Sequence, residues 1–169
     1  MPDGDLDRTT AWSRQLAAAH ATLRERLRRL RSAPGGDGPG AGREGDGADG
    51  DLLAHCLGFC AALTAHHEGE DGGLFAELLR VRPDLEATVD ALEEDHWLIA
   101  RILGTVQDLA RESQGGVTPE RERRIQGELD GLAAIMESHF RYEERAIGAA
   151  LDDGVADTGW SRPVLTFGD

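Results

Sequence analysis

Hydrophobic residues recur along this chain in alternating steps of three and four, which is the spacing of one face of an α-helix. Four segments carry the pattern, and we expect helices over residues 6–31, 51–80, 84–111 and 119–151. The most regular stripe consists of Leu85, Val89, Leu92, His96, Ile99, Leu103, Val106 and Ala110. No segment shows the alternation of period two that indicates a strand, so the pattern predicts an all-α protein.

The ends of the predicted helices are marked by residues with special backbone preferences. Pro83 and Pro119 stand at first helical positions, where proline is tolerated, and Thr118 is a capping residue. Residues 33–50 are dense in Gly, Pro and Asp and bury too little to order themselves. We expect a flexible surface connection there, with a functional lid as the alternative reading.

The second predicted helix is weakened near its middle. Asp71-Gly72-Gly73 combines residues of low helix propensity, so a local bend is expected at this point. We expect the core face to continue through this weak point, from Glu70 to Gly73 and then to Glu77.

Together these elements predict an up-down-up-down four-helix bundle over residues 1–151, with a long Gly-rich loop between the first two helices. The stripes predict near-parallel packing with crossing angles of about 20°. Residues 152–169 form an irregular tail in which we expect no helix. Apolar tail residues such as Trp160 and Phe167 are expected to pack across the bundle or onto a protein partner.

Six polar residues occupy positions that the hydrophobic period assigns to the core, each near the middle of its helix: His20, His66, Glu70, His96, His139 and Glu143. Antiparallel packing would bring them to one level, where unpaired polar groups cost several kcal/mol each. Imidazoles and carboxylates in such a layer are the ligands of a borderline to hard divalent metal. Shared between two metals, the set gives about two imidazoles per ion, with both carboxylates free to bridge.

Residues next to the six candidates leave other assignments of the metal ligands open. His67 lies about 100° from His66 around the helix, so it is expected at the edge of the core face, flanking the site rather than ligating. Asp71 and Glu144 each follow a candidate glutamate and could replace or supplement it. A single histidine on an apolar face is more often a packed core residue; the coincidence on four helices favours metal.

Charge and composition narrow the possible partners. The chain has 18 Lys+Arg, all of them Arg, against 32 Asp+Glu, and a formal net charge of −14. This acidity argues against nucleic acid and anionic membranes. No apolar run approaches the roughly 20 residues of a membrane helix, and no signal peptide is evident at the start, so a cytoplasmic protein is expected. Cys56 and Cys60 are expected to be reduced and buried.

The candidate ligands and their neighbours resemble the hemerythrin-like (HHE cation-binding) domain over about residues 12–150. The resemblance is carried by His20, His66-x3-Glu70-Asp71, Asp95-His96 and His139-Phe140-x2-Glu143-Glu144. It implies a four-helix bundle with a non-haem di-iron centre, oxo- or hydroxo-bridged, and O2 or peroxide chemistry. It also implies that the four histidines are iron ligands and that Glu70 and Glu143 bridge the two irons.

One family ligand is missing from the third predicted helix. Respiratory hemerythrins carry two histidines four residues apart there, whereas the positions at that spacing from His96 are Leu92 and Ala100. His67, Glu93 or solvent would fill this position, or one iron would be more open. The expected function is binding or sensing of O2, peroxide or nitric oxide. The alternatives are a di-iron oxidase, oxygenase or peroxide-decomposing enzyme, and a metal-free helical interaction module.

Overall fold

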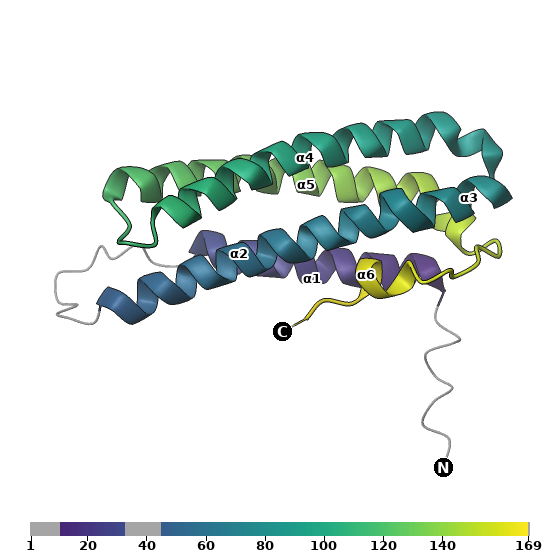
Figure 1. Cartoon of the computed structure of the whole chain (residues 1–169). Helices are drawn as coiled ribbons and strands as arrows, with labels where there is room; N and C mark the ends of the chain where they lie inside the picture. The colour runs from purple at the N-terminus through teal and green to yellow at the C-terminus, as the bar shows by residue number, and fades with distance from the viewer. Residues whose placement is uncertain (1–10, 33–44, 169) are drawn as a thin grey trace, which may run out of the picture.

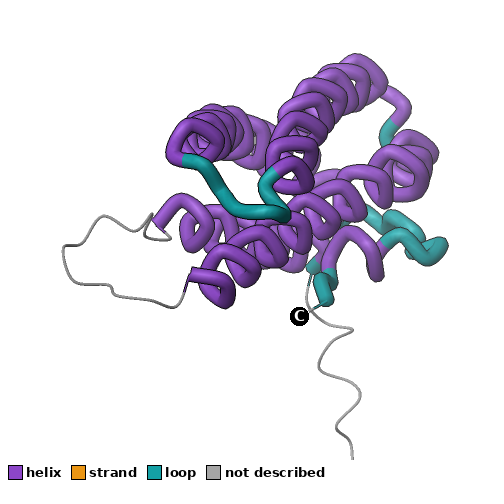
Figure 2. The backbone as a smooth tube through the Cα atoms, turned by 60° about the vertical axis from the view of Figure 1, so that its left-hand side comes forward, coloured by secondary structure: helices purple, strands orange, loops and turns teal. Residues whose placement is uncertain are grey.

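In the computed structural model, which describes residues 11–32 and 45–168, every regular element is helical (Figure 2). The elements are α1 Trp12–Ser32, α2 Gly45–Gly69, the π-helix η1 Glu70–Leu74, α3 Phe75–Val81, the 3-10 turn η2 Pro83–Leu85, α4 Glu86–Glu112, α5 Pro119–Leu151 and α6 Ser161–Leu165. The long helices lie side by side, with α5 against α1 and α4, and α2 against α1 and α4 (Figure 1). The prediction of an all-α helical bundle is confirmed.

Most ends of the long helices lie close to the predicted ones, but α4 begins at Glu86, and Pro83, expected to open that helix, begins the 3-10 turn η2 instead. Thr118 caps α5, since its side chain accepts a hydrogen bond from the Arg121 backbone N–H at 3.3 Å. Residues 6–10 of the first predicted helix and residues 33–44 of the predicted loop lie outside the described residues. The loop prediction was wrong for residues 45–50, which form the first turns of α2. Extension of a helix adds a backbone hydrogen bond for each residue without a new nucleation step, which allows α2 to continue into this stretch despite the low helix propensity of glycine.

The weak point of the second predicted helix is a π-helical turn, η1. The expected core positions Gly73 and Glu77 were wrong, because the buried residues are Leu74 and Leu78 instead. A π turn accommodates one extra residue, so every position after it moves by one step around the helix. The glycines mark where the extra residue is accommodated, and the hydrophobic stripe resumes one residue later.

The apolar core is divided into two clusters. Leu23, Leu63, Ile99 and Met136 belong to one cluster. The other contains Leu16, Leu74, Leu92 and Ile147, together with residues of the tail. On α1 the boundary between them falls at His20, which lies between Leu16 and Leu23, and on α4 it falls at His96. On α5 it falls at Glu143, because Phe140 still belongs to the first cluster and Ile147 to the second. A polar layer therefore crosses the bundle between two hydrophobic clusters.

The tail is ordered and packs on the bundle, and the expectation that it has no helix was wrong. The carboxylate of Asp157 accepts hydrogen bonds from the backbone N–H groups of Gly159 and Ser161, at 2.9 and 3.2 Å, and this starts the short helix α6. Trp160 and Val164 are buried, and α6 contacts α1 and α2 (Figure 1). Of the two expected roles for the apolar tail residues, packing across the bundle is the one observed.

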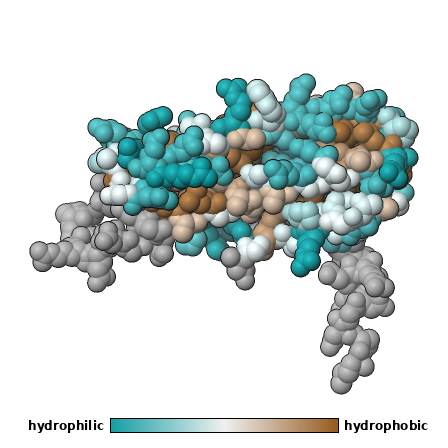
Figure 3. All heavy atoms as spheres, viewed as in Figure 1, coloured by the Kyte–Doolittle hydropathy of each residue, from teal (hydrophilic) through white to brown (hydrophobic). Residues whose placement is uncertain are grey.

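The outer surface is largely polar. Hydrophilic residues cover much of the face shown in Figure 3, with hydrophobic patches between them. None of the helices in the described ranges has the length and apolar character needed to cross a membrane. Among large apolar side chains, Trp97 is the most exposed of those described, at 66%.

Candidate metal centre

Seven titratable side chains fill the polar layer between the two apolar clusters, and each is at most 5% exposed: His20, His66, His67, Glu70, His96, His139 and Glu143. They come from α1, α2, η1, α4 and α5. Burial of so many polar groups is unfavourable unless they are paired or bind a cation. The layer includes all six residues that the sequence placed in the core face.

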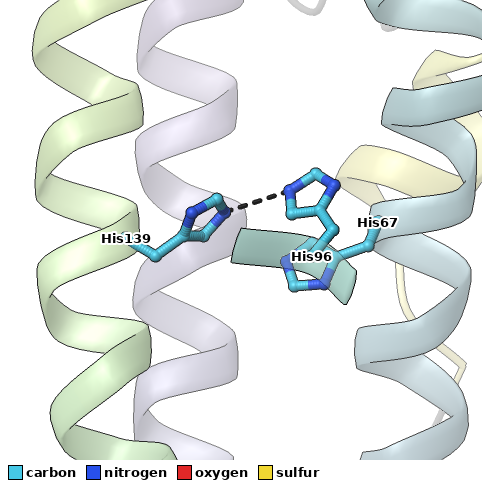
Figure 4. Close-up of side chains that lie close together, drawn as sticks. All are labelled: His67, His96 and His139. Atoms are coloured by element: carbon cyan, nitrogen blue, oxygen red, sulfur yellow. Dashed lines mark hydrogen bonds between the residues drawn. The ribbon is translucent and has the colours of Figure 1, made fainter. Parts of the chain in front are cut away.

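The seven side chains form two adjacent groups. Within each group, one nitrogen or oxygen from every residue lies within 4.8 Å of the others. The first group is His20, His66, Glu70 and Glu143, and the second is His67, His96 and His139. Figure 4 shows the three histidines of the second group pointing toward one another. Each group offers enough ligand atoms to hold one metal ion.

Four of the histidines are oriented by an acceptor on the outer side of the ring. The Nδ1 contacts are His20 with Glu144 at 2.8 Å, His66 with the carbonyl of Val164 at 2.7 Å, His96 with Asp71 at 2.6 Å, and His139 with Asp95 at 3.0 Å. Ionised carboxylates and carbonyls only accept hydrogen bonds, so in each pair Nδ1 donates. In the neutral imidazole Nε2 then carries a lone pair directed into the layer, the arrangement typical of metal-ligating histidines.

The inward atoms lack the hydrogen bonds that a closed polar network would have. Within the described part of the chain, the Nε2 atoms of His20, His66 and His67 and the carboxyl oxygens of Glu70 and Glu143 are buried without a hydrogen-bond partner. Nε2 of His96 and Nε2 of His139 lie 3.0 Å apart, so two lone pairs face each other when both rings are neutral. Cations in the two groups would satisfy these atoms, and the donor set fits a metal that accepts imidazole and carboxylate.

Burial keeps most of the histidines neutral, the form that metal binding needs. It lowers the pKa of His66 to about 3, with a further lowering from the neighbouring charge of His20. Burial and the nearby His96 lower the pKa of His67 well below its ordinary value, and burial also lowers the pKa of His139. His20 differs, since contacts with Glu143 and Glu144 outweigh burial and raise its pKa.

The two buried glutamates behave differently in the absence of a metal. Burial raises the pKa of Glu70 well above its ordinary value, and the charge of Glu143 adds to this effect. For Glu143, burial is outweighed by the contacts with Glu70 and His20, so its pKa is lowered. Nε2 of His66 lies 2.6 Å from Oε1 of Glu70, so a cation bound there would contact both side chains.

The structure places several neighbouring residues differently from the sequence analysis. The expectation that His67 lies at the edge of the core face was wrong: it is 5% exposed, and its ring stacks on His96 at 3.9 Å. The polar layer is wide enough to include a side chain about 100° from His66. Asp71 and Glu144 contact histidine Nδ1 atoms and belong to neither ligand group. Glu93 is exposed.

Two orienting groups were missed. Asp95, the acceptor for His139, directly precedes His96 in the sequence, just as Asp71 and Glu144 directly follow a buried glutamate. A carboxylate adjacent to a core ligand candidate was the signal that could have identified it. The acceptor for His66 is a backbone carbonyl, and no residue type indicates such a group.

Comparison with known protein families identifies a match. A family model described as the hemerythrin HHE cation binding domain matches residues 13–151. No curated protein and no solved structure matches the chain. The matched span includes all seven residues of the polar layer and ends at the last residue of α5, before the tail.

Proposed function

Because the chain belongs to the hemerythrin HHE cation-binding domain family, we propose that it is a non-haem di-iron protein that binds or senses O2, peroxide or nitric oxide. In this proposal the long helices form an up-down-up-down bundle around the centre. The observation that carries it is the convergence of five imidazoles and two buried carboxylates whose inward atoms lack hydrogen-bond partners or face one another.

The ligand assignment follows the two groups. His20 and His66 would hold one iron, and His67, His96 and His139 the other. Glu143 would bridge them, since its Oε2 lies 3.3 Å from Nε2 of His20 and 3.6 Å from Nε2 of His139. Glu70 belongs to the first group and would be the second bridge, as the likeness to the family implies. His67 would take the place of the histidine that the third helix of respiratory hemerythrins supplies and that is absent here.

The irons would supply one-electron redox chemistry and open positions for small diatomic or peroxide ligands. The chain supplies the surroundings. Asp71, Asp95 and Glu144 hold the Nδ1 protons of three histidines and keep Nε2 directed inward. The apolar clusters on both sides exclude bulk water from the layer. The glutamates compensate the metal charge inside a low-dielectric core.

Anaerobic loading with Fe(II), followed by exposure to air, tests the proposal. We expect about two irons per chain and the visible absorption of an oxidised di-iron centre. His66→Ala and His139→Ala remove a ligand from each group and are expected to lose iron. His55→Ala is the matched control, since His55 is an exposed histidine on α2. No iron uptake, or equal uptake in all four proteins, contradicts the proposal.

Experiments on the same iron-loaded protein distinguish a binding or sensing role from an enzymatic one. Reversible cycling with O2 or nitric oxide, without steady consumption of a reductant, supports a binding or sensing role. Continuous turnover of peroxide or of an organic substrate would instead identify a peroxide-decomposing enzyme, an oxidase or an oxygenase. A melting temperature indifferent to iron and to chelators would identify a metal-free interaction module.

A further inference from the structure

The tail helix α6 lies directly on two glycines next to the polar layer. A Cβ atom at Gly69 would lie 2.8 Å from Cγ2 of Val164 and 3.0 Å from Cγ of Pro163. A Cβ atom at Gly73 would lie 2.8 Å from Cβ of Trp160. These distances are shorter than any ordinary carbon–carbon contact, so α6 can dock this closely only because both positions lack side chains.

Docking brings a backbone carbonyl to a histidine of the centre. The carbonyl of Val164 accepts from Nδ1 of His66 at 2.7 Å, and both groups are buried. Val164 lies in the last turn of α6, where helix carbonyls have no intrahelical partner. The histidine satisfies this carbonyl, and the carbonyl in turn selects the tautomer of the histidine.

The rest of the tail holds this arrangement in place. The rings of Trp160 and Trp12 meet edge to face, with centroids 5.0 Å apart. Beyond α6, the ring of Phe167 lies 6.0 Å from the ring of His66. Arg26 on α1 lies over the Phe167 ring at 5.8 Å and donates to the carbonyl of Gly168 at 2.9 Å. The tail is thus tied to α1 and α2 on both sides of the His66 contact.

We propose that residues 160–168, the tail strap, are a positioning element of the metal centre and slow the loss of its iron. The inference rests on the proposed function. The other three oriented histidines take their acceptors from side chains within the matched span 13–151, whereas His66 takes its acceptor from outside that span. The strap fixes Nε2 of His66 toward the layer and covers the α1–α2 side of that residue.

Three glycine-to-alanine variants test the strap without changing any ligand. Gly69→Ala places a methyl group against Val164 of α6, and Gly73→Ala places one against Trp160, the residue before α6. Both are expected to displace the strap. Gly72→Ala is the matched control, because it lies in the same π turn as Gly73 and a Cβ there meets nothing within 4 Å. All three changes favour helix formation, so a difference between them reports on the strap.

The first readout uses the metal-free protein and is independent of iron. Nitrogen-15 NMR of the histidine side chains is expected to show His66 protonated at Nδ1 in the wild type and in Gly72→Ala. In Gly69→Ala this tautomer is expected to give way to a mixture. An unchanged His66 signal in both Gly69→Ala and Gly73→Ala overturns the positioning role.

The second readout is iron retention. Loss of an orienting hydrogen bond typically weakens metal binding about 10- to 100-fold. We expect release of iron to a ferrous chelator to be faster by a comparable factor in Gly69→Ala and Gly73→Ala, and unchanged in Gly72→Ala. Equal rates in all variants overturn the strap's role in retention. Failure of the wild type to take up iron contradicts the proposed function instead, while the NMR readout still decides whether the strap positions His66.

Discussion

Each oriented histidine of the layer depends on one other group for its direction. For His139 that group is Asp95, which is 41% exposed and lies on the neighbouring helix α4. Because an exposed carboxylate contributes little to stability, its main effect is expected on the metal site. We therefore expect that Asp95 can be changed without unfolding the bundle.

Replacing this carboxylate tests its role directly. Asp95→Ala is expected to weaken iron binding about 10- to 100-fold, because the His139 ring loses its fixed orientation. Anaerobic Fe(II) titration measures the change. Asp90→Ala is the control, since Asp90 is an exposed acid on the same helix. Equal affinities of the two variants would show that Asp95 does not orient His139.

His67 should make the metal-free protein sensitive to acid. Its folded pKa is lowered well below the ordinary histidine value, so the unfolded chain takes up a proton that the folded chain does not. The contribution of the neutral His67 side chain to the free energy of unfolding is fully present above about pH 6.5. It is lost as the pH falls toward the pKa of His67 in the folded protein. Relative to His67→Phe, which retains a ring to stack on His96, the wild type should lose up to about 1.4 kcal/mol more stability per pH unit. Urea unfolding between pH 7 and pH 5 measures the difference, and parallel curves would contradict it.

At the scale of elements, the π turn η1 behaves as a one-residue insertion in an otherwise regular helix. The expected core face continues up to Glu70, the first residue of the turn. From Leu74, the last residue of the turn, the buried positions are displaced by one, at Leu74 and Leu78. Removing one residue from the turn would restore the α-helical register. Adding one would rotate the following turns away from the core.

Because removing and adding one residue in η1 should have different effects, the two changes together test whether the π turn sets the register of the following residues. Deletion of Gly72 should leave Leu74 and Leu78 in the core and give a folded protein. Insertion of an alanine after Gly72 should turn both leucines toward solvent and cost about 3–6 kcal/mol, the value of burying two such side chains. Chemical unfolding of both variants measures the difference. Equal destabilisation would show that the π turn does not set the register.

Helical periodicity predicted correctly which residues of a single helix face the core, and it did not predict features that depend on several helices or on the backbone. The stripe from Val89 to Ala110 is buried as predicted, and the polar residues that interrupt the stripes form the observed layer. His67 was misplaced because a stripe describes one line along a helix, whereas a layer shared by several helices is wider. The register shift was missed because only two glycines mark it. The carbonyl of Val164 was missed because every residue has one.

At the scale of the whole molecule, the ligand groups connect α1, α2, α4 and α5. Iron binding should therefore stabilise the entire bundle. At an iron concentration 1,000 times the dissociation constant the gain is about 4 kcal/mol, which corresponds to a rise in melting temperature of about 8–16 °C. Anaerobic calorimetry with and without Fe(II) measures the shift. His66→Ala, which lacks one ligand, should show a smaller shift, and an equal shift would place the iron elsewhere.

The division of the core also has a consequence for how the protein unfolds. Each apolar cluster is continuous within itself, and the layer between them consists of groups that gain little from contact with one another when no cation is present. The metal-free chain is therefore expected to melt less cooperatively, with a van't Hoff enthalpy below the calorimetric enthalpy. Ions coordinated from four helices would link the two halves, and the two enthalpies should then agree. Metal occupancy would in this way decide whether the molecule unfolds as one unit or as two.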